Sequence, residues 1–171
     1  MKYIKILFFS ILLFYSSYIY ADSNFVHAKL ADKLYKPWGI AVLDDDHLLI
    51  TQKSGELFKI NIRNKTKTEI DHNLIVSEYG QGGLLDVLYY NEKVYVSYAE
   101  ERDDEKYSTS VAIGELKGNS ISFNNIFQSE PPINSKIHFG SRLEIKNDHL
   151  FITVGERQTG KLTQEIDNHF G

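Results

Sequence analysis

Two short stretches contain the side chains best suited to chemistry in this sequence. Residues 137–143 place His138 just before an apolar run, and residues 80–86 place Gln81 among three glycines. Imidazole is the side chain whose ordinary pKa lies nearest neutrality, so His138 could accept a proton under working conditions. An amide beside glycines could donate and accept hydrogen bonds to a flat molecule lying against bare backbone. The two stretches therefore predict a proton acceptor and a polar binding group at the starts of two β-strands.

Both stretches also have a purely structural interpretation. A single histidine more often fills a structural place than a catalytic one. The glycines of residues 80–83 are equally typical of a tight link that needs positive φ. His47 and His149 each follow an acidic turn at matching places in a repeat, which favours a structural role for them, whereas His138 has no such counterpart. The histidines show no zinc-binding spacing on a helix.

The elements that must position these residues are short apolar runs separated by turns, with no helical period. Four runs lie between residues 40 and 70, four between 84 and 128, and two between 142 and 154. Residues 40–51 also match residues 143–153. A repeat of about 45 to 55 residues with four strands per unit is typical of a β-propeller blade. A β-sandwich, the alternative, would give short strands without this self-similarity.

The sequence thus predicts an all-β chain that forms about the first two to three four-stranded blades of a β-propeller. Closing a propeller takes at least four blades. We therefore expect residues 22–171 to be the N-terminal part of a larger propeller, truncated at its C-terminus.

Composition narrows the function further. Hydrophobic residues make up 42% and charged residues 25% of the chain, and the net charge is −4 with the basic residues scattered. A nucleic-acid partner is not expected from this distribution. The chain has no cysteine, which excludes disulfides, thiolate metal sites and a cysteine nucleophile. No glycine-rich dinucleotide loop or Walker lysine loop is present.

The first residues have the features of a secretion signal. Lys2 and Lys5 precede an apolar run over residues 6–15, and cleavage after Ala21 would remove residues 1–21. A membrane anchor is the alternative, but the run is shorter than the roughly 20 residues that a spanning helix needs. We expect a periplasmic or secreted protein with no stable membrane insertion after cleavage.

Five motifs in order give the sequence a family resemblance. They are Pro37-Trp38-Gly39-Ile40-Ala41, Gly80-Gln81-Gly82-Gly83-Leu84-Leu85-Asp86, Val96-Ser97-Tyr98, His138-Phe139-Gly140-Ser141-Arg142-Leu143 and Phe151-Ile152-Thr153-Val154-Gly155-Glu156. With these motifs the sequence resembles the soluble PQQ-dependent aldose sugar dehydrogenases of the glucose/sorbosone dehydrogenase family, from about Leu34 to the last residue.

The resemblance implies a six-bladed propeller that binds pyrroloquinoline quinone (PQQ) with calcium and oxidises aldose sugars to lactones, passing the electrons to an external acceptor. It implies that His138 is the general base and that Gln81 contacts the cofactor. It also implies that Arg142 supports the loop and that Glu156 and Arg157 lie on the substrate rim.

The resemblance has limits along the chain. Residues just before the histidine, often polar or acidic in the family, are Lys136 and Ile137 here. The family's calcium-binding loop and most of the basic residues that hold the quinone carboxylates fall beyond Gly171. No metal ligand is therefore predicted within this sequence.

Two other functions remain open. One is a propeller that binds a protein or glycan without chemistry. The other is a metal-dependent, lactonase-like propeller, which would need acidic side chains at inner strand ends, where Gln81 and His138 stand instead. For the dehydrogenase that the resemblance implies, the chain alone is expected to be inactive because its cofactor contacts are incomplete.

Overall fold

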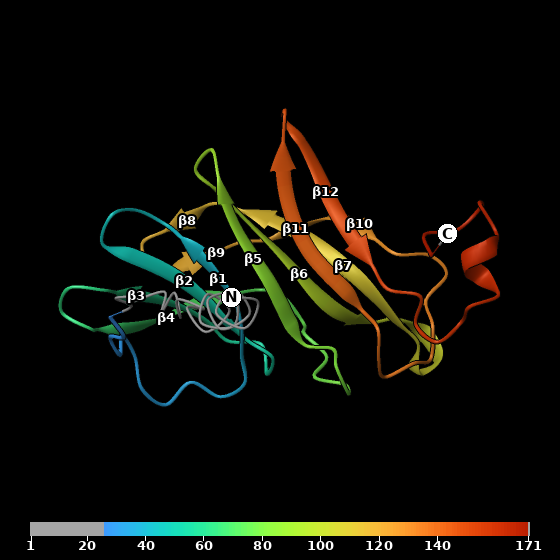
Figure 1. Ribbon diagram of the computed structural model, residues 1–171, viewed down its shortest axis with the longest axis horizontal. Coiled ribbons are helices and arrows are strands. Elements are labelled where there is room, and N and C mark those ends of the chain that lie inside the picture. Colours follow the sequence, from blue (N-terminus) through green and yellow to red (C-terminus); the bar gives the residue numbers. More distant parts are fainter. Residues whose placement is uncertain (1–25, 171) are drawn as a thin grey trace, which may run out of the picture.

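The computed structural model describes residues 26–170, so the predicted signal at residues 1–21 lies outside the described residues. The regular elements of the described part are β-strands apart from two short 3₁₀ turns, and three sheets lie side by side (Figure 1). Among these residues no helix is long and apolar enough to cross a membrane. The all-β prediction is confirmed.

The strands fall into the predicted sets of four, four and two. The first unit contains β1 (Pro37–Val42), β2 (His47–Gln52), β3 (Leu57–Asn61) and β4 (Lys67–His72). The second contains β5 (Leu84–Tyr90), β6 (Lys93–Glu101), β7 (Tyr107–Gly114) and β10 (Asn124–Gln128). The third contains β11 (Gly140–Lys146) and β12 (His149–Val154). Two single 3₁₀ turns, Asp103–Glu105 and Leu162–Gln164, and two short strands between β7 and β10 complete the described elements.

The last of the four predicted runs between residues 84 and 128 does not form one strand. We expected it to run from residue 120 to residue 128, but the strand is interrupted at residues 122 and 123. The side chain of Asn73 accepts the Phe123 N–H at 2.7 Å and donates to its carbonyl at 3.0 Å, which removes Phe123 from the ladder. The separated β9 (Ser120–Ile121) forms a hairpin with β8 (Leu116–Lys117) and pairs in parallel with β4 of the first unit.

Strand register confirms the repeat at the level of single residues. The innermost pair of each unit contains one bulge, between Pro37 and Ile40, between Leu84 and Val87, and between Gly140 and Leu143. A bulge inserts one extra residue into a strand and bends it. Its recurrence at the same place makes Gly39, Asp86 and Arg142 equivalent positions.

A buried hydroxyl joins the first unit to the second. Thr51, with no exposed surface, accepts the Gly39 N–H at 2.8 Å within its own unit. The same hydroxyl donates to the Leu85 carbonyl of the next unit. One side chain thus satisfies backbone groups of two neighbouring blades.

The second joint repeats this arrangement with serine. Ser97 Oγ accepts the Asp86 N–H at 3.0 Å and donates to the Ser141 carbonyl at 2.7 Å. At the matching place in the third unit, Thr153 Oγ1 accepts the Arg142 N–H at 2.9 Å. The blades are therefore held in a fixed rotation by a repeated hydrogen bond as well as by apolar packing.

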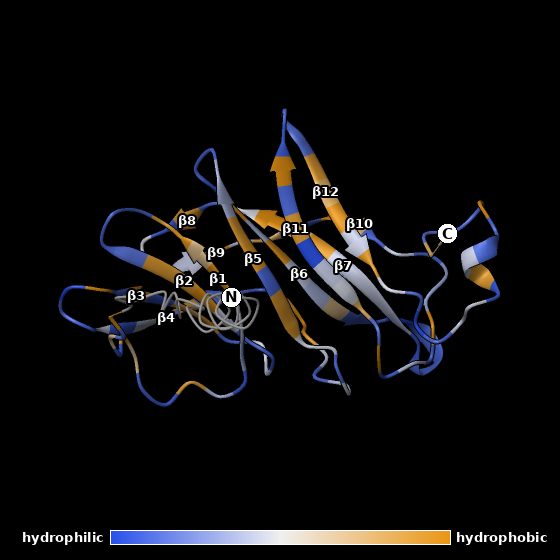
Figure 2. Cartoon of the chain, viewed as in Figure 1, coloured by the Kyte–Doolittle hydropathy of each residue, from blue (hydrophilic) through white to orange (hydrophobic). Residues whose placement is uncertain are grey.

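The apolar packing between units follows the same equivalence. The main core lies between the first two sheets, and Figure 2 shows apolar stripes along β2 and β5. Val87 and Leu143 are 3% and 2% exposed because each faces the preceding unit, whereas the equivalent Ile40 is 60% exposed. Ile40 thus marks a blade face that has no neighbouring unit among residues 26–170.

The joint can be tested by removing its hydroxyl. Thr51→Val keeps the shape of the side chain but leaves the buried Gly39 N–H and Leu85 carbonyl without their partner. We expect this to lower the free energy of unfolding by about 1–3 kcal/mol, measured by denaturant titration. Thr51→Ser, which keeps the hydroxyl, is the matched control. Equal unfolding midpoints for the valine variant and the wild type would show that the joint contributes nothing.

Candidate active site

The structure brings the two predicted site residues together although they are 57 positions apart. Gln81 lies in the connection that precedes β5, and His138 lies in the connection that precedes β11. The Gln81 N–H donates to the Lys136 carbonyl at 2.7 Å, and Gln81 Oε1 accepts the His138 N–H at 2.9 Å. These two hydrogen bonds join the loops side by side at the entrance to the second and third units.

Gly80 is required for this contact. Its φ is +61°, and a Cβ atom at this position would lie 2.3 Å from the Lys136 carbonyl oxygen. No side chain fits in that space, so only glycine lets the two backbones approach. The glycines around Gln81 therefore serve a close backbone contact, as well as the turn that the sequence indicated.

The imidazole of His138 is oriented by Glu156. The His138 Nδ1 atom is hydrogen-bonded to Glu156 Oε1, and the histidine side chain is 46% exposed. A carboxylate only accepts hydrogen bonds, so in the neutral imidazole Nδ1 carries the proton and Nε2 is the basic nitrogen. This is the arrangement in which a carboxylate orients an imidazole that acts as a base.

The contact also affects the carboxylate. The hydrogen bond from His138 is the main cause that lowers the pKa of Glu156 below its usual value, and partial burial opposes it. Glu156 was expected on the substrate rim, but the structure places it against the predicted base. The β11–β12 register explains this, since Gly140 pairs with Val154 and residues 138 and 156 follow on the same end of the hairpin.

The remaining two predicted residues have different surroundings. Arg142 Nη1 donates to the buried Asp86 carboxylate at 2.9 Å, and that carboxylate also accepts the Leu143 N–H at 2.8 Å. Arg142 thus supports the start of β11, as expected. The expectation for Arg157 is wrong: its side chain has no exposed surface, so it cannot form part of a substrate rim.

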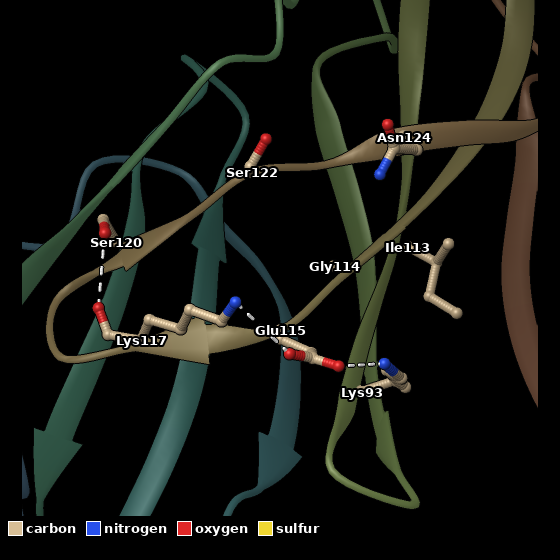
Figure 3. Close-up of a pocket in the computed structure, with 8 residues that line it drawn as sticks. All are labelled: Lys93, Ile113, Gly114, Glu115, Lys117, Ser120, Ser122 and Asn124. Atoms are coloured by element: carbon tan, nitrogen blue, oxygen red, sulfur yellow. Dashed lines mark hydrogen bonds and ion pairs between the residues drawn. The ribbon is translucent and has the colours of Figure 1, made fainter.

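Figure 3 shows a hollow along the β8–β9 hairpin. Its volume is about 410 Å³, and neither Gln81 nor His138 is among the residues that line it. Its charged side chains satisfy one another, since Glu115 is paired with both Lys93 and Lys117. Across residues 26–170 no group of three or more histidine, cysteine or carboxylate side chains could hold a metal ion.

The His138–Glu156 pair predicts a change that is measurable by titration. In His138→Ala the hydrogen bond to the carboxylate is lost, so the pKa of Glu156 should rise toward its ordinary value. Following the side-chain carboxyl carbon of Glu156 by NMR between about pH 2 and 7 gives this pKa directly. An unchanged pKa in the alanine variant would mean that the pair does not form in solution.

Together the fold and the site define a class of protein: part of a β-propeller in which a histidine, hydrogen-bonded to a carboxylate, lies where two units meet. The sequence of residues 34–171 matches the Glucose / Sorbosone dehydrogenase family. The chain belongs to this family.

The relatives agree with the fold and with the family. Over 148 residues the chain is 34% identical to aldose sugar dehydrogenase YliI of Escherichia coli (strain K12). The aligned region covers 81% of this chain and 40% of that protein. It superposes with a TM-score of 0.77 at 33% identity on the apo form of the soluble aldose sugar dehydrogenase from Escherichia coli, covering 84% of this chain and 44% of the other.

A more distant match extends the comparison of the fold. The PQQ-bound form of an aldose sugar dehydrogenase from Streptomyces coelicolor gives a TM-score of 0.70 at 23% identity, over 86% of this chain and 46% of that one. The chain thus spans less than half the length of each of these relatives. The propeller prediction is confirmed for the part that the chain covers.

Proposed function

We propose that this chain is the N-terminal part of a PQQ-dependent dehydrogenase that oxidises aldose sugars to lactones. The observation that carries the proposal is the junction of Gln81 and His138, with His138 Nδ1 engaged by Glu156 and Nε2 left basic. The aldose sugar dehydrogenases among the relatives support the reaction class. One of them is described with PQQ bound, which supports the cofactor.

The residues present suit a flat, anionic quinone. Gln81 Oε1 is used by the His138 N–H, so the amide nitrogen remains as a donor for a carbonyl or carboxylate oxygen. The glycines on both sides of Gln81 are packed against other parts of the chain, so the exposed amide of Gln81 is the group that this loop offers to the quinone. In this proposal Gln81 holds the quinone, and the calcium ion takes its ligands from residues beyond this chain.

The chain's own residues carry the proton transfer. Bound PQQ supplies the acceptor for the hydride that leaves the sugar C1 atom. His138 Nε2 takes the proton from the anomeric hydroxyl, so that C1 and its oxygen form the lactone carbonyl. Glu156 stabilises the imidazolium that results, and Gln81 fixes the backbone of His138 so that the base is in place before the sugar binds.

The proposal includes location and electron flow. With residues 1–21 acting as a secretion signal, the protein would work in the periplasm or outside the cell. The electrons would then pass from the reduced cofactor to an external acceptor, which regenerates the enzyme for the next sugar.

Reconstitution of the complete protein tests the function. Purified protein is mixed with PQQ and calcium, and reduction of a redox dye is followed with aldoses as substrates. Sugar-dependent dye reduction with lactone formation is the expected result. Hydrolysis of lactones that needs calcium but no PQQ would favour a lactonase, and neither activity would favour a binding propeller; both of these outcomes contradict the proposal.

A further inference from the structure

Arg157 is a buried cation that forms no ion pair with any carboxylate among residues 26–170. Its side chain has no exposed surface, and burial, the one cause acting on it, lowers the pKa of its guanidinium to about 10. Burying a charge is costly unless hydrogen bonds compensate. The contacts of the guanidinium must therefore offset the cost of burying it, and they indicate what the residue does.

Three backbone carbonyls satisfy the guanidinium. Nε donates to Ile137 O at 3.0 Å, Nη1 donates to Tyr107 O at 3.1 Å, and Nη2 donates to Ser135 O. Two of these acceptors belong to the loop that carries His138, and the third is the first residue of β7. Arg157 thus connects the histidine loop, through Ser135 and Ile137, to Tyr107 of the second unit.

The ring of Phe139 completes the contact. The guanidinium carbon lies 3.6 Å from the centroid of this buried ring, a cation–π distance. The Phe139 carbonyl in turn accepts the Thr109 hydroxyl at 2.6 Å. His138 therefore stands between two residues, Ile137 and Phe139, that Arg157 holds on either side.

The backbone of His138 explains why such restraint matters. Its φ of +56° lies in the left-handed region, which non-glycine residues rarely adopt and which persists only where the surroundings enforce it. Glu156, the residue before Arg157 in the chain, is the carboxylate that engages His138 Nδ1. One short segment thus supplies both the partner of the imidazole and the anchor of its loop.

We propose that Arg157 is a positioning residue, whose guanidinium holds the His138 loop where Glu156 can engage the imidazole. The inference rests on the proposed function only for the role of His138 as the base. A planar guanidinium with five donors can reach three carbonyls in different directions, whereas a lysine ammonium is a single point charge on a flexible stem. Arg157→Lys therefore keeps the charge but loses the simultaneous contacts.

The test uses the chain itself and needs no cofactor. The pKa of Glu156 is measured by carboxyl-carbon NMR in the wild type and in Arg157→Lys, with thermal melting as the check on folding. We expect the variant to fold and the pKa of Glu156 to move up toward its usual value, because the His138 contact loosens. Arg63→Lys, the same exchange at an exposed surface arginine, should leave that pKa unchanged.

Chemical rescue separates positioning from general stabilisation. In Arg157→Ala, added guanidinium ion should restore the lowered pKa of Glu156 by occupying the vacated site. A folded Arg157→Lys protein with the wild-type pKa of Glu156 would overturn the proposal. The proposal would also be overturned if Arg157→Lys and Arg157→Ala did not fold and guanidinium did not restore folding. Arg157 would then be needed for the stability of the whole fold and not for the position of the loop.

The complete protein adds a second readout. If the proposed dehydrogenase is active, kcat of Arg157→Lys should fall by about 10²-fold, the scale expected for a misplaced catalytic group, with little change in the KM for the sugar. Inactivity of the wild type would contradict the proposed function. It would not affect the inference about Arg157, because the NMR titration of Glu156 does not depend on turnover.

Discussion

Replacing His138 with alanine should lower kcat of the complete, PQQ-loaded protein by about 10²–10⁴-fold, the usual contribution of a general base. The variant should still bind the quinone, because Gln81 keeps its amide donor. The expectation follows from the exposed imidazole, whose Nδ1 is occupied by Glu156 and whose Nε2 is the basic atom left for the substrate. Steady-state dye reduction and quinone titration by absorbance measure the two properties separately.

A second histidine provides the matched control. His149 stands at the β11–β12 turn, where its Nδ1 contacts the Asn147 carbonyl at 2.7 Å, and no sequence or structural feature gives it a chemical role. His149→Ala should keep wild-type turnover. If His138→Ala turned over sugar at the wild-type rate, another group would have to be the base.

The second large effect is expected from a single added methyl group in Gly155→Ala. A Cβ atom at residue 155 would lie 2.0 Å from the His138 carbonyl oxygen and 2.6 Å from its carbon, so the backbone of the histidine loop must move. Such overpacking typically costs about 1–3 kcal/mol of stability. The displaced base should also lower kcat by about 10²-fold. Denaturant unfolding and dye reduction measure the two losses.

Gly160→Ala is the control for this substitution. Gly160 lies in the same C-terminal segment, but a Cβ atom there meets nothing within 4 Å and its φ is not in the left-handed region. Its stability and turnover should stay at the wild-type level. A Gly155→Ala protein as stable and as active as Gly160→Ala would show that the loop is not packed as described.

Much of the fold could be predicted from the sequence because each unit repeats one pattern. Alternating apolar residues and acidic turns predicted the β1–β2 and β11–β12 hairpins. The match between residues 40–51 and residues 143–153 corresponds to the bulge and register that the two hairpins share. The break at Phe123 could not be predicted. It depends on the side chain of Asn73, fifty positions earlier, and only the folded chain brings them together.

The site was predicted only in part. His138 and Gln81 could be selected because imidazole and a glycine-flanked amide stand out in sequence. The Glu156 contact requires the β11–β12 register with its one-residue bulge, and a prediction of that bulge would have placed residue 156 opposite 138. The burial of Arg157 depends on carbonyls from β7 and from the histidine loop, which no local pattern reveals.

A crystal structure of the complete protein with PQQ, calcium and an aldose bound tests the central claim most directly. We predict that the quinone lies against the Gln81 loop and that His138 Nε2 lies within hydrogen-bond distance of the anomeric hydroxyl. A quinone bound elsewhere, or an imidazole whose Nε2 points away from the sugar, would contradict the account.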